Sequence, residues 1–376
     1  MKTNNILSAA VYGRLVASAP LCFLLCLSSG LTFAAGWGTW TKADRPPGVT
    51  SPTFSPPPAV SGHVATSSPR IPNVYLFGGL TGPAGSPTTD TLYEYDVGGW
   101  REITQKKGPM EESPRQRMYS AAGILEEDMY LFGGWDPGAP GSGGEFLNDV
   151  WKLDLVTKEW ENTGIELPFP VSRHAACAVG DMIVIHTYQG VFVFRKDGDS
   201  RKITLQDTSG DRPDGLSMCA QVTLGDSGVL IFGGSTKTQQ LSDATYYLDT
   251  NTWEWTQLRN IGDATPSSRA SPCAAAVQDS STQAVVFGGA SIGGDGYEGG
   301  KGLMPLSDTW LVTVNKAAGT ALWKQLAMSD VGPEARLAAS LSCIYGEGGN
   351  RLILQGGYDS TSKETFGEPW VLRIDE

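Results

Sequence analysis

The amino-acid sequence predicts an all-β protein, a six-bladed β-propeller whose ring is closed by an N-terminal strand that completes the last blade. Three observations predict this fold. A short apolar run ending in two glycines recurs along the chain, each copy is followed by an aromatic-rich strand, and no stretch of ten or more residues beyond the N-terminus has helical apolar periodicity. The 47 glycines and 11 tryptophans among the 376 residues suit many short strands joined by tight turns.

Residues 1–35 are expected to lie outside this fold. Residues 1–14 carry Lys2 and Arg14 and no acid, and residues 15–35 carry no charge at all. A positive start, an apolar centre and small residues at its end are typical of a cleaved signal peptide. The apolar segment is also long enough to span a membrane, so an uncleaved membrane anchor is the alternative. We therefore expect a secreted protein, in contact with a membrane only through residues 15–35 if that segment is retained.

The double-glycine motif defines the repeat. Its copies are VYLFGG (74–79), MYLFGG (129–134), VLIFGG (229–234), AVVFGG (284–289) and LILQGG (352–357). In the third repeat, MIVIHT (182–187) keeps the apolar run but has His186 and Thr187 where the glycines are expected. A short unbroken apolar run predicts a strand buried on both faces, and paired glycines allow a sharp turn with positive φ.

A third and a fourth strand follow each motif. The third strands are DTLYEYD (90–96), DVWKLD (149–154), DATYYLD (243–249), DTWLVTV (308–314) and EPWVLRID (368–375), and the fourth strands centre on Trp100, Trp160, Trp255 and Trp323. Each tryptophan covers a blade edge with a large apolar surface, which contributes ~2–3 kcal/mol. The third repeat lacks the acid and the tryptophan and has the shortest loop between its second and third strands, which predicts a low wall and a side entrance there.

The last repeat ends at its third strand, near Glu376. Residues 36–43 (GWGTWTKA) have the character of the missing fourth strand, so we expect them beside residues 368–375. The alternative is a flexible leader. Trp37 and Trp40 disfavour it, because pairs of exposed tryptophans are unusual in linkers. The propeller is therefore expected to occupy residues 36–376.

The double glycine, the aromatic strand, the tryptophan and an arginine at this spacing resemble the kelch-repeat family over residues 36–376. The resemblance implies the propeller fold, which hosts many functions. The chain is similar to the central domain of galactose oxidase, but copper radical oxidases of that type need a Cys–Tyr crosslink and histidine ligands that the three histidines do not match. It is also similar to plant specifier proteins, whose iron site follows a Glu-xxx-Asp-xxx-His pattern. Glu145 and Asp149 fit that pattern, but Leu153 stands in the third position, so we expect no metal and no cofactor.

The candidate ligand site lies where the chain enters the first strand of each blade. The sequence alignment puts the following residues at equivalent positions: Gly62, Arg117, Arg173, Gly215, Arg269 and Arg336. Four arginines should then ring one mouth of the central channel, on the top face, where they could bind a carboxylate, a sulfate, a phosphate or an acidic peptide. The structural alternative is that these arginines pair with carboxylates and carbonyl groups inside the blades.

Three histidines are expected on the same face. His63 and His174 follow Gly62 and Arg173, and His186 ends the strand antiparallel to the one that His174 begins. Histidine exchanges protons near neutral pH, so these residues are the catalytic candidates. The alternatives are structural hydrogen bonding and metal binding, although no tight ligand spacing is present.

Trp135, Tyr188 and Tyr358 are expected at the same rim as apolar walls of the ligand site. The net charge of −12 repels phosphate backbones, so no nucleic-acid partner is expected. The sequence thus predicts a monomeric kelch propeller that binds a small polar or anionic ligand, or an acidic segment of a partner protein, at this mouth. The alternative is an enzyme with lyase, isomerase or cyclase chemistry on a small molecule in the same pocket, with arginine polarising the substrate and histidine moving protons.

Overall fold

The computed structural model describes residues 37–43, 55–83, 85–96, 99–107, 112–138, 143–198, 200–294, 302–328, 331–346 and 349–374. Within these ranges the regular elements are β-strands, and no helix there is long and apolar enough to cross a membrane. The expected signal peptide or anchor, residues 1–35, lies outside the described residues.

Each of the first three sequence repeats forms four antiparallel strands paired in chain order. The first repeat forms β2 (Val64–Ser68), β3 (Ile71–Phe77), β4 (Leu92–Asp96) and β5 (Gly99–Ile103). The second forms β7 (Ala121–Leu125), β8 (Asp128–Asp136), β9 (Glu145–Asp154) and β10 (Glu159–Glu166), with β6 (Lys106–Lys107) parallel to β10 at the edge. The third forms β11 (Ala175–Val179), β12 (Met182–Thr187), β13 (Gly190–Asp197) and β14 (Ser200–Gln206).

The fourth and fifth repeats share one nine-stranded sheet. The fourth repeat forms β16 (Ala220–Leu224), β17 (Gly228–Phe232), β18 (Thr245–Asp249) and β19 (Glu254–Ile261), with β15 (Ser209–Gly210) beside β19. The fifth forms β20 (Cys273–Ala276), β21 (Gln283–Phe287), β24 (Thr309–Asn315) and β25 (Thr320–Gln325), and its β22 (Ala290–Gly294) and β23 (Gly302–Pro305) form a separate hairpin. Parallel pairing of β19 with β25 joins the two repeats.

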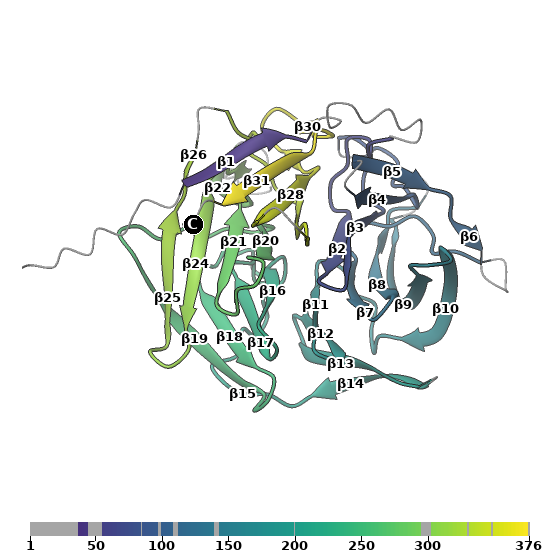
Figure 1. Ribbon diagram of the computed structural model, residues 1–376, viewed down its shortest axis with the longest axis horizontal. Coiled ribbons are helices and arrows are strands. Elements are labelled where there is room, and N and C mark those ends of the chain that lie inside the picture. Colours follow the sequence, from purple (N-terminus) through teal and green to yellow (C-terminus); the bar gives the residue numbers. More distant parts are fainter. Residues whose placement is uncertain are drawn as a thin grey trace, which may run out of the picture. The chain divides into compact units, whose positions relative to one another are not determined.

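The last repeat combines both ends of the described chain. It contains β27 (Ser340–Cys343), β28 (Arg351–Gln355) and β31 (Trp370–Ile374), with β29 (Tyr358–Asp359) and β30 (Glu364–Thr365) in a separate hairpin. The strand β1 (Trp37–Lys42) pairs antiparallel with β31, with Trp40 opposite Leu372, and parallel with β26 (Ala327–Met328). In Figure 1 the purple β1 lies beside the yellow β31.

The first strands of the repeats contact one another in a cycle. β2 contacts β7 and β27, β11 contacts β7 and β16, and β20 contacts β16 and β27. Figure 1 shows these strands around a central axis, with the later strands of each repeat farther out. The arrangement is all-β and propeller-like.

Aromatic side chains pack between successive repeats. Two phenylalanines that precede a double glycine pack on the tryptophan in the fourth strand of the next repeat, with ring centroids 5.3 Å apart for Phe77 and Trp160 and 4.6 Å apart for Phe232 and Trp323, and Phe132 packs on Phe194 of the third repeat at 5.6 Å. The glycine that follows cannot carry a side chain. At Gly133, which has a φ of 47°, a Cβ atom would lie 2.8 Å from the carbonyl oxygens of Leu147 and Val171.

The third repeat has a different register from the one that its motif predicts. His186 pairs with Ala175 just as Phe132 pairs with Ala121 in the second repeat, so His186 replaces the phenylalanine and not the first glycine. The physical reason is the turn. Thr187 pairs directly with Gly190 across two residues, so the strand continues to its end without the positive-φ glycines of the other repeats.

Candidate functional site

A cycle of backbone hydrogen bonds joins the starts of the first strands. In the described part of the chain, each repeat contributes one residue with positive φ at this point: Gly62, Tyr119, Arg173, Met218, Ser271 and Ala338. Each of them donates its N–H to the carbonyl oxygen of the equivalent residue in the preceding repeat, at N–O distances of 2.6 to 3.3 Å. The bond from Gly62 to Ala338 connects the first repeat with the last.

This cycle corrects the predicted alignment of the arginines. Arg173 is itself a member of the cycle, whereas Arg117, Arg269 and Arg336 each stand two residues before a member. These three arginines are at most 1% exposed. This burial disagrees with the expectation that four arginines ring one mouth of the channel, because three of them are loop residues whose guanidinium groups are buried.

The guanidinium groups of these three buried arginines are hydrogen-bonded to carboxylates and carbonyl oxygens. The Arg117 guanidinium donates to both oxygens of Asp149, at 2.6 and 2.8 Å, and to the carbonyl of Gly133 at 3.0 Å. Arg269 binds Asp308 in the same bidentate way, at 2.7 and 2.8 Å. Arg336 donates to the carbonyl of Gly356 and to Glu334, and it stacks on the ring of Phe366. Bidentate pairs of this kind hold the loops of one repeat together.

The other rim candidates lie apart from the large cavity described below. Arg173 is partly exposed and stacks 4.5 Å from the ring centre of Tyr119. Trp135 packs beside the exposed Phe146, Tyr188 lies under the ammonium group of Lys237, and Tyr358 belongs to the hairpin of β29 and β30. None of Arg173, Trp135, Tyr188 and Tyr358 lines that cavity.

The three histidines are buried. His63 shares a hydrogen bond of 2.7 Å with Ser340 Oγ, and His186 lies next to the start of the strand that follows His174. Burial lowers the pKa of His63 to about 3 and the pKa values of His174 and His186 to about 4. All three side chains are therefore neutral at pH 7, and an exchange of protons there would need a more acidic medium.

The central channel contains a large cavity, with a volume of about 1300 Å³. The first strands and the turns that follow them contribute to its wall, for example residues 65–70 of the first repeat and Gln221, Thr223, Gly225 and Asp226 of the fourth. The channel therefore opens where the first strands end, and the hydrogen-bonded cycle lies at their other end. This position corrects the expected site, because the open mouth is on the face opposite to the arginines and histidines.

Short side chains line the channel. Its wall includes Ala65, Ala122, Ala274 and Ser342, and Gln221 donates a hydrogen bond to the carbonyl of Val184 at 3.0 Å. The channel-lining thiols are not nucleophiles at neutral pH, since burial raises the pKa of Cys343 to about 12 and also raises the pKa of Cys177. The channel thus offers space and hydrogen-bonding groups but no activated nucleophile.

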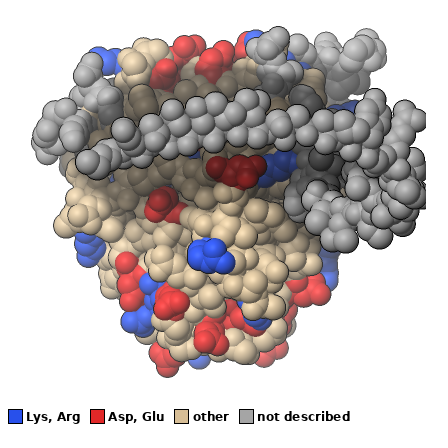
Figure 2. Space-filling model, turned by 90° about the vertical axis from the view of Figure 1, so that its left-hand side faces the viewer, with Lys and Arg blue, Asp and Glu red and all other residues tan. Residues whose placement is uncertain are grey.

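The mouth of the channel carries more acids than bases. Its described lining has the bases Arg70 and Lys196 and the acids Glu126, Asp181, Asp226 and Asp279. Lys196 is already paired with Glu126 at 2.7 Å and with Asp128 at 3.3 Å. The mouth therefore favours a basic or uncharged ligand over an acidic one. Figure 2, viewed from the left of Figure 1, shows acidic and basic residues interspersed along the lower part of the molecule, with no continuous basic patch among the described residues on that side.

The residues that fit two positions of the specifier-protein iron pattern are engaged in ion pairs. Glu145 binds Arg115 at 2.7 Å, Asp149 binds Arg117, and Leu153 is fully buried. Across the described ranges, no group of three or more histidine, cysteine or acidic side chains is placed to hold a metal ion.

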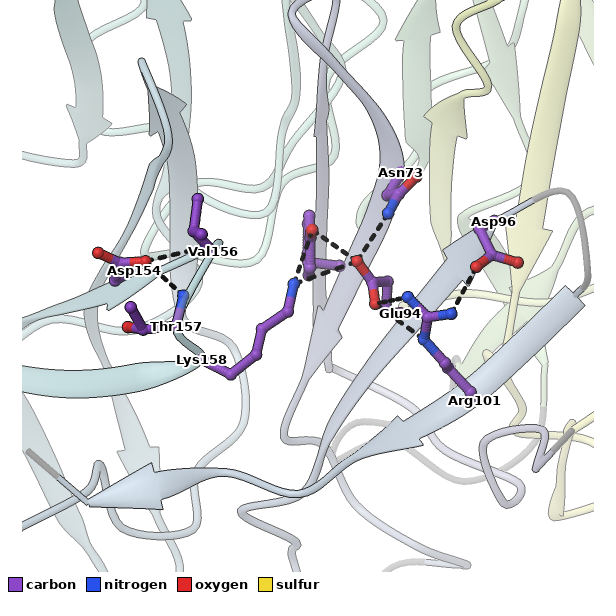
Figure 3. Close-up of polar contacts among 9 residues, drawn as sticks. Asn73, Glu94, Asp96, Arg101, Asp154, Val156, Thr157 and Lys158 are labelled. Atoms are coloured by element: carbon purple, nitrogen blue, oxygen red, sulfur yellow. Dashed lines mark hydrogen bonds and ion pairs between the residues drawn. The ribbon is translucent and has the colours of Figure 1, made fainter. Parts of the chain in front are cut away.

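A buried charge cluster joins the first and second repeats. Glu94, which is 1% exposed, accepts hydrogen bonds from Asn73 and Tyr75 at 2.6 Å, from Arg101 at 2.9 Å and from Lys158 at 3.2 Å. Figure 3 shows Asn73, Arg101 and Lys158 directed at the Glu94 carboxylate from different parts of the chain. Burial alone would raise the pKa of Glu94, but these partners outweigh it and lower the pKa to about 2. The cluster is structural, because it lies outside the lining of the channel.

Comparison with known proteins gives one family match along the described fold. The family described as "KLHDC2/KLHL20/DRC7 Kelch-repeats domain" matches residues 38–197 and again residues 186–376. The solved structure of YjhT superimposes with a TM-score of 0.62, covers 86% of this chain and 99% of its own, and is 15% identical. At that identity the likeness concerns the fold alone.

Several curated proteins are similar in sequence, and two of them show the range of these matches. The host cell factor of Drosophila melanogaster is 30% identical over 155 residues, which are 38% of this chain and 10% of that protein. The N-(sulfonatooxy)prop-2-enimidothioate sulfolyase of Thlaspi arvense is 27% identical over 247 residues, which are 57% of this chain and 67% of that protein. The matches cover between 8% and 24% of the length of the first relatives.

Proposed function

Because the chain belongs to the kelch-repeat family, we propose that it is a protein-binding propeller that holds a segment of a partner protein in the open end of its central channel. One observation carries this proposal: a cavity of about 1300 Å³, lined by short side chains and open at one face. Such a cavity has room for several side chains of a bound segment.

The proposed scaffold is a ring of six blades closed by β1. Two observations support it. The hydrogen-bonded cycle passes once through each sequence repeat, and β1 supplies a fourth strand beside β31 in the last repeat. A closed ring leaves no free sheet edge between its ends, which suits a rigid and monomeric binding module. Size-exclusion chromatography with light scattering tests the monomer.

The partner segment is proposed to be uncharged or basic. The sequence favoured an acidic segment because of its four arginines, but three of them are buried in pairs. Asp181, Asp226 and Asp279 are exposed at the channel mouth, and no basic side chain is recorded within ion-pair distance of them in the described part of the chain. These carboxylates attract positive charge and repel acidic segments.

Selection of peptides from a random displayed library on the purified propeller tests this proposal. We expect the selected peptides to be depleted in Asp and Glu, and we expect the double variant Asp226→Lys with Asp279→Lys to bind them at least tenfold more weakly. Arg173→Ala, on the opposite face, is the matched control and should bind as the wild type does. Selection of acid-rich peptides whose binding depends on Arg173 would contradict the proposal for the channel mouth. The binding site would then lie on the face with Arg173, Trp135, Tyr188 and Tyr358.

An enzyme that acts on a small molecule is the second candidate. The similarity to the sulfolyase over 67% of that protein favours it. Neutral buried histidines and paired arginines give it little support. Incubating the purified protein with the relative's substrate class, an O-sulfonated thiohydroximate, and following sulfate release tests it. Turnover that disappears in the His174→Gln variant would establish the enzyme.

Export remains a proposal that rests on residues 1–35. The test is to express the full chain with a C-terminal tag in a secretory host and to sequence the N-terminus of the secreted protein. Cleavage close to residue 35 is expected. An uncleaved chain in the membrane fraction would support the anchor instead.

A further inference from the structure

One position between the third and fourth repeats departs from the packing rule of this fold. In two other pairs of repeats, Phe77 and Phe232 pack on the tryptophan of the next repeat. His186 takes this position in the third repeat, with its ring 6.2 Å from that of Trp255 and an angle of 69° between the planes. His186 is 4% exposed. A polar imidazole ring is thus buried at a position where other repeats have the apolar ring of phenylalanine.

A second cavity lies at this position. It has a volume of about 160 Å³, and its described lining includes His186, Gln189, Val191, Leu205, Arg212 and Trp255. The two-residue turn between Thr187 and Gly190 explains why it is open. In the second repeat the same connection is far longer, because β8 and β9 extend past the double glycine to Asp136 and Glu145. The low wall expected from the sequence is therefore the wall of a real cavity.

The lining of this second cavity combines apolar side chains with polar and charged ones. Val191 and Trp255 are buried, and Leu205 is exposed although it is apolar. Arg212 pairs with Asp214 at 3.0 Å, so much of its charge is compensated at the cavity. Because burial lowers the pKa of His186 to about 4, its ring is neutral at physiological pH. One ring nitrogen is hydrogen-bonded to the backbone of Pro213, so the other nitrogen is left to accept a hydrogen bond from a ligand. The arrangement is that of small-molecule sites, in which apolar walls surround a few polar groups.

We propose that this cavity is a second binding site, distinct from the channel, for a neutral, planar and polar molecule of about six to nine non-hydrogen atoms. The apolar face of the ligand lies between Leu205 and Trp255, and its amide or heteroaromatic group hydrogen-bonds to His186. Size supports this class, since an apolar protein cavity of about 150 Å³ holds a benzene molecule. The charge of the lining disfavours an anion, because the acids Asp207 and Asp214 outnumber the base Arg212, and the neutral imidazole suits an uncharged hydrogen-bonding group.

Three probes of equal size and different charge test the proposal: benzamide, benzoate and benzylamine. Binding is measured by ligand-observed NMR and by the ring signals of the histidines, of which the chain has three. Benzamide is expected to shift the His186 ring signals saturably and to bind at least fivefold more tightly than the two ions. Equal or tighter binding of either ion, or no saturable binding of benzamide, would overturn the proposal.

Two variants locate the site. His186→Phe restores the residue that the fold uses in other repeats, so we expect a melting temperature no lower than that of the wild type and at least tenfold weaker benzamide binding. Leu205→Arg fills the cavity from its exposed side and should have the same effect on binding without touching the core. The variants His63→Gln and Asp226→Lys lie outside the cavity and serve as controls that retain binding. Unchanged benzamide binding in both site variants would contradict the assignment.

Discussion

Buried ionisable side chains connect neighbouring repeats at single points. Glu94 gathers four donors, one of them the Lys158 ammonium group of the next repeat. The three histidines are buried in a neutral state, which costs nothing above their ordinary pKa but disfavours the folded protein below it. Both features make stability depend on individual residues and on pH.

Replacing Glu94 by Gln is expected to destabilise the protein by about 2 kcal/mol, because the change leaves Arg101 and Lys158 without their carboxylate while both keep partial access to water. Urea unfolding followed by tryptophan fluorescence measures the difference. The matched control is Glu126→Gln, which removes an exposed partner of Lys196 and should change stability by less than about 0.5 kcal/mol. Equal effects of the two variants would show that burial of Glu94 contributes nothing.

Stability is expected to fall as the pH is lowered from 6.5 to 5. Each histidine has an ordinary pKa of 6.5 and a folded pKa of about 3 or 4, so the unfolded chain takes up protons first. The stabilisation is complete above pH 6.5 and is lost as the pH falls toward the folded pKa, by about 2 kcal/mol for each histidine between pH 7 and pH 5. The stabilisation from Glu94 is complete above its ordinary pKa of 4.5 and is lost only as the pH falls from there toward about 2, so it does not change between pH 6.5 and 5.

Urea unfolding at half-unit pH steps measures this dependence. The variant His186→Phe removes one of the three groups, so its stability should fall by about a third less than that of the wild type over the same range. A stability that is flat between pH 6.5 and 5 would show that the histidines gain protons in the folded protein.

The strand β1 is the element on which the integrity of the last repeat depends. Trp40 is buried, packs 5.5 Å from the ring of Phe287 and donates a hydrogen bond from its indole N–H to Thr309. Thus β1 completes one repeat through backbone pairing and contacts the preceding repeat through this side chain. The contact follows the same aromatic pattern as the internal repeats.

Trp40→Ala is expected to destabilise the protein by about 3–5 kcal/mol, because it removes a large buried ring and leaves a cavity. Thr41→Ala, at the next and exposed position of β1, is the control and should cost under about 1 kcal/mol. Thermal unfolding measures both variants. A small effect of Trp40→Ala would mean that β1 is dispensable and that its pairing with β31 adds little.

The whole molecule presents a channel that is open at one face and is tied by backbone hydrogen bonds at the other. The acids of the mouth come from several turns, each far from the others in the sequence, and together they produce one field around the opening. A long-range field of this kind speeds the approach of a charged partner and is screened by salt.

Association of a lysine-containing peptide selected on the propeller is therefore expected to slow severalfold as the salt concentration rises from about 0.05 to 0.5 M. Stopped-flow fluorescence measures the rate. In the Asp226→Lys and Asp279→Lys double variant this dependence should vanish or reverse. An unchanged salt dependence in the variant would place the peptide elsewhere on the surface.

Much of the fold could be predicted from the sequence, and less of the site. Apolar runs, paired glycines and tryptophans at fixed spacing identify the repeat, because each feature serves the packing within a repeat or against its neighbour. The turns after the first strands also carry an acid in several repeats, as in Glu126, Asp181 and Asp226, and this periodic signal could have pointed to the channel mouth. The arginines were more conspicuous, but an arginine at a loop looks the same in sequence whether it faces a ligand or a buried aspartate.

The sequence by itself determined the kelch-type repeat, the all-β class and the short connection in the third repeat, since these follow from local patterns of apolar residues, glycine and loop length. Only the tertiary structure decided that Arg173 is equivalent to Tyr119, two residues after Arg117, and that His186 replaces a phenylalanine. The structure also decided that the channel opens on the face away from Arg173 and His186. The reason is that register and exposure depend on partners far apart in the chain. A shift of one or two residues in a strand or loop leaves its composition unchanged but moves a side chain to another face.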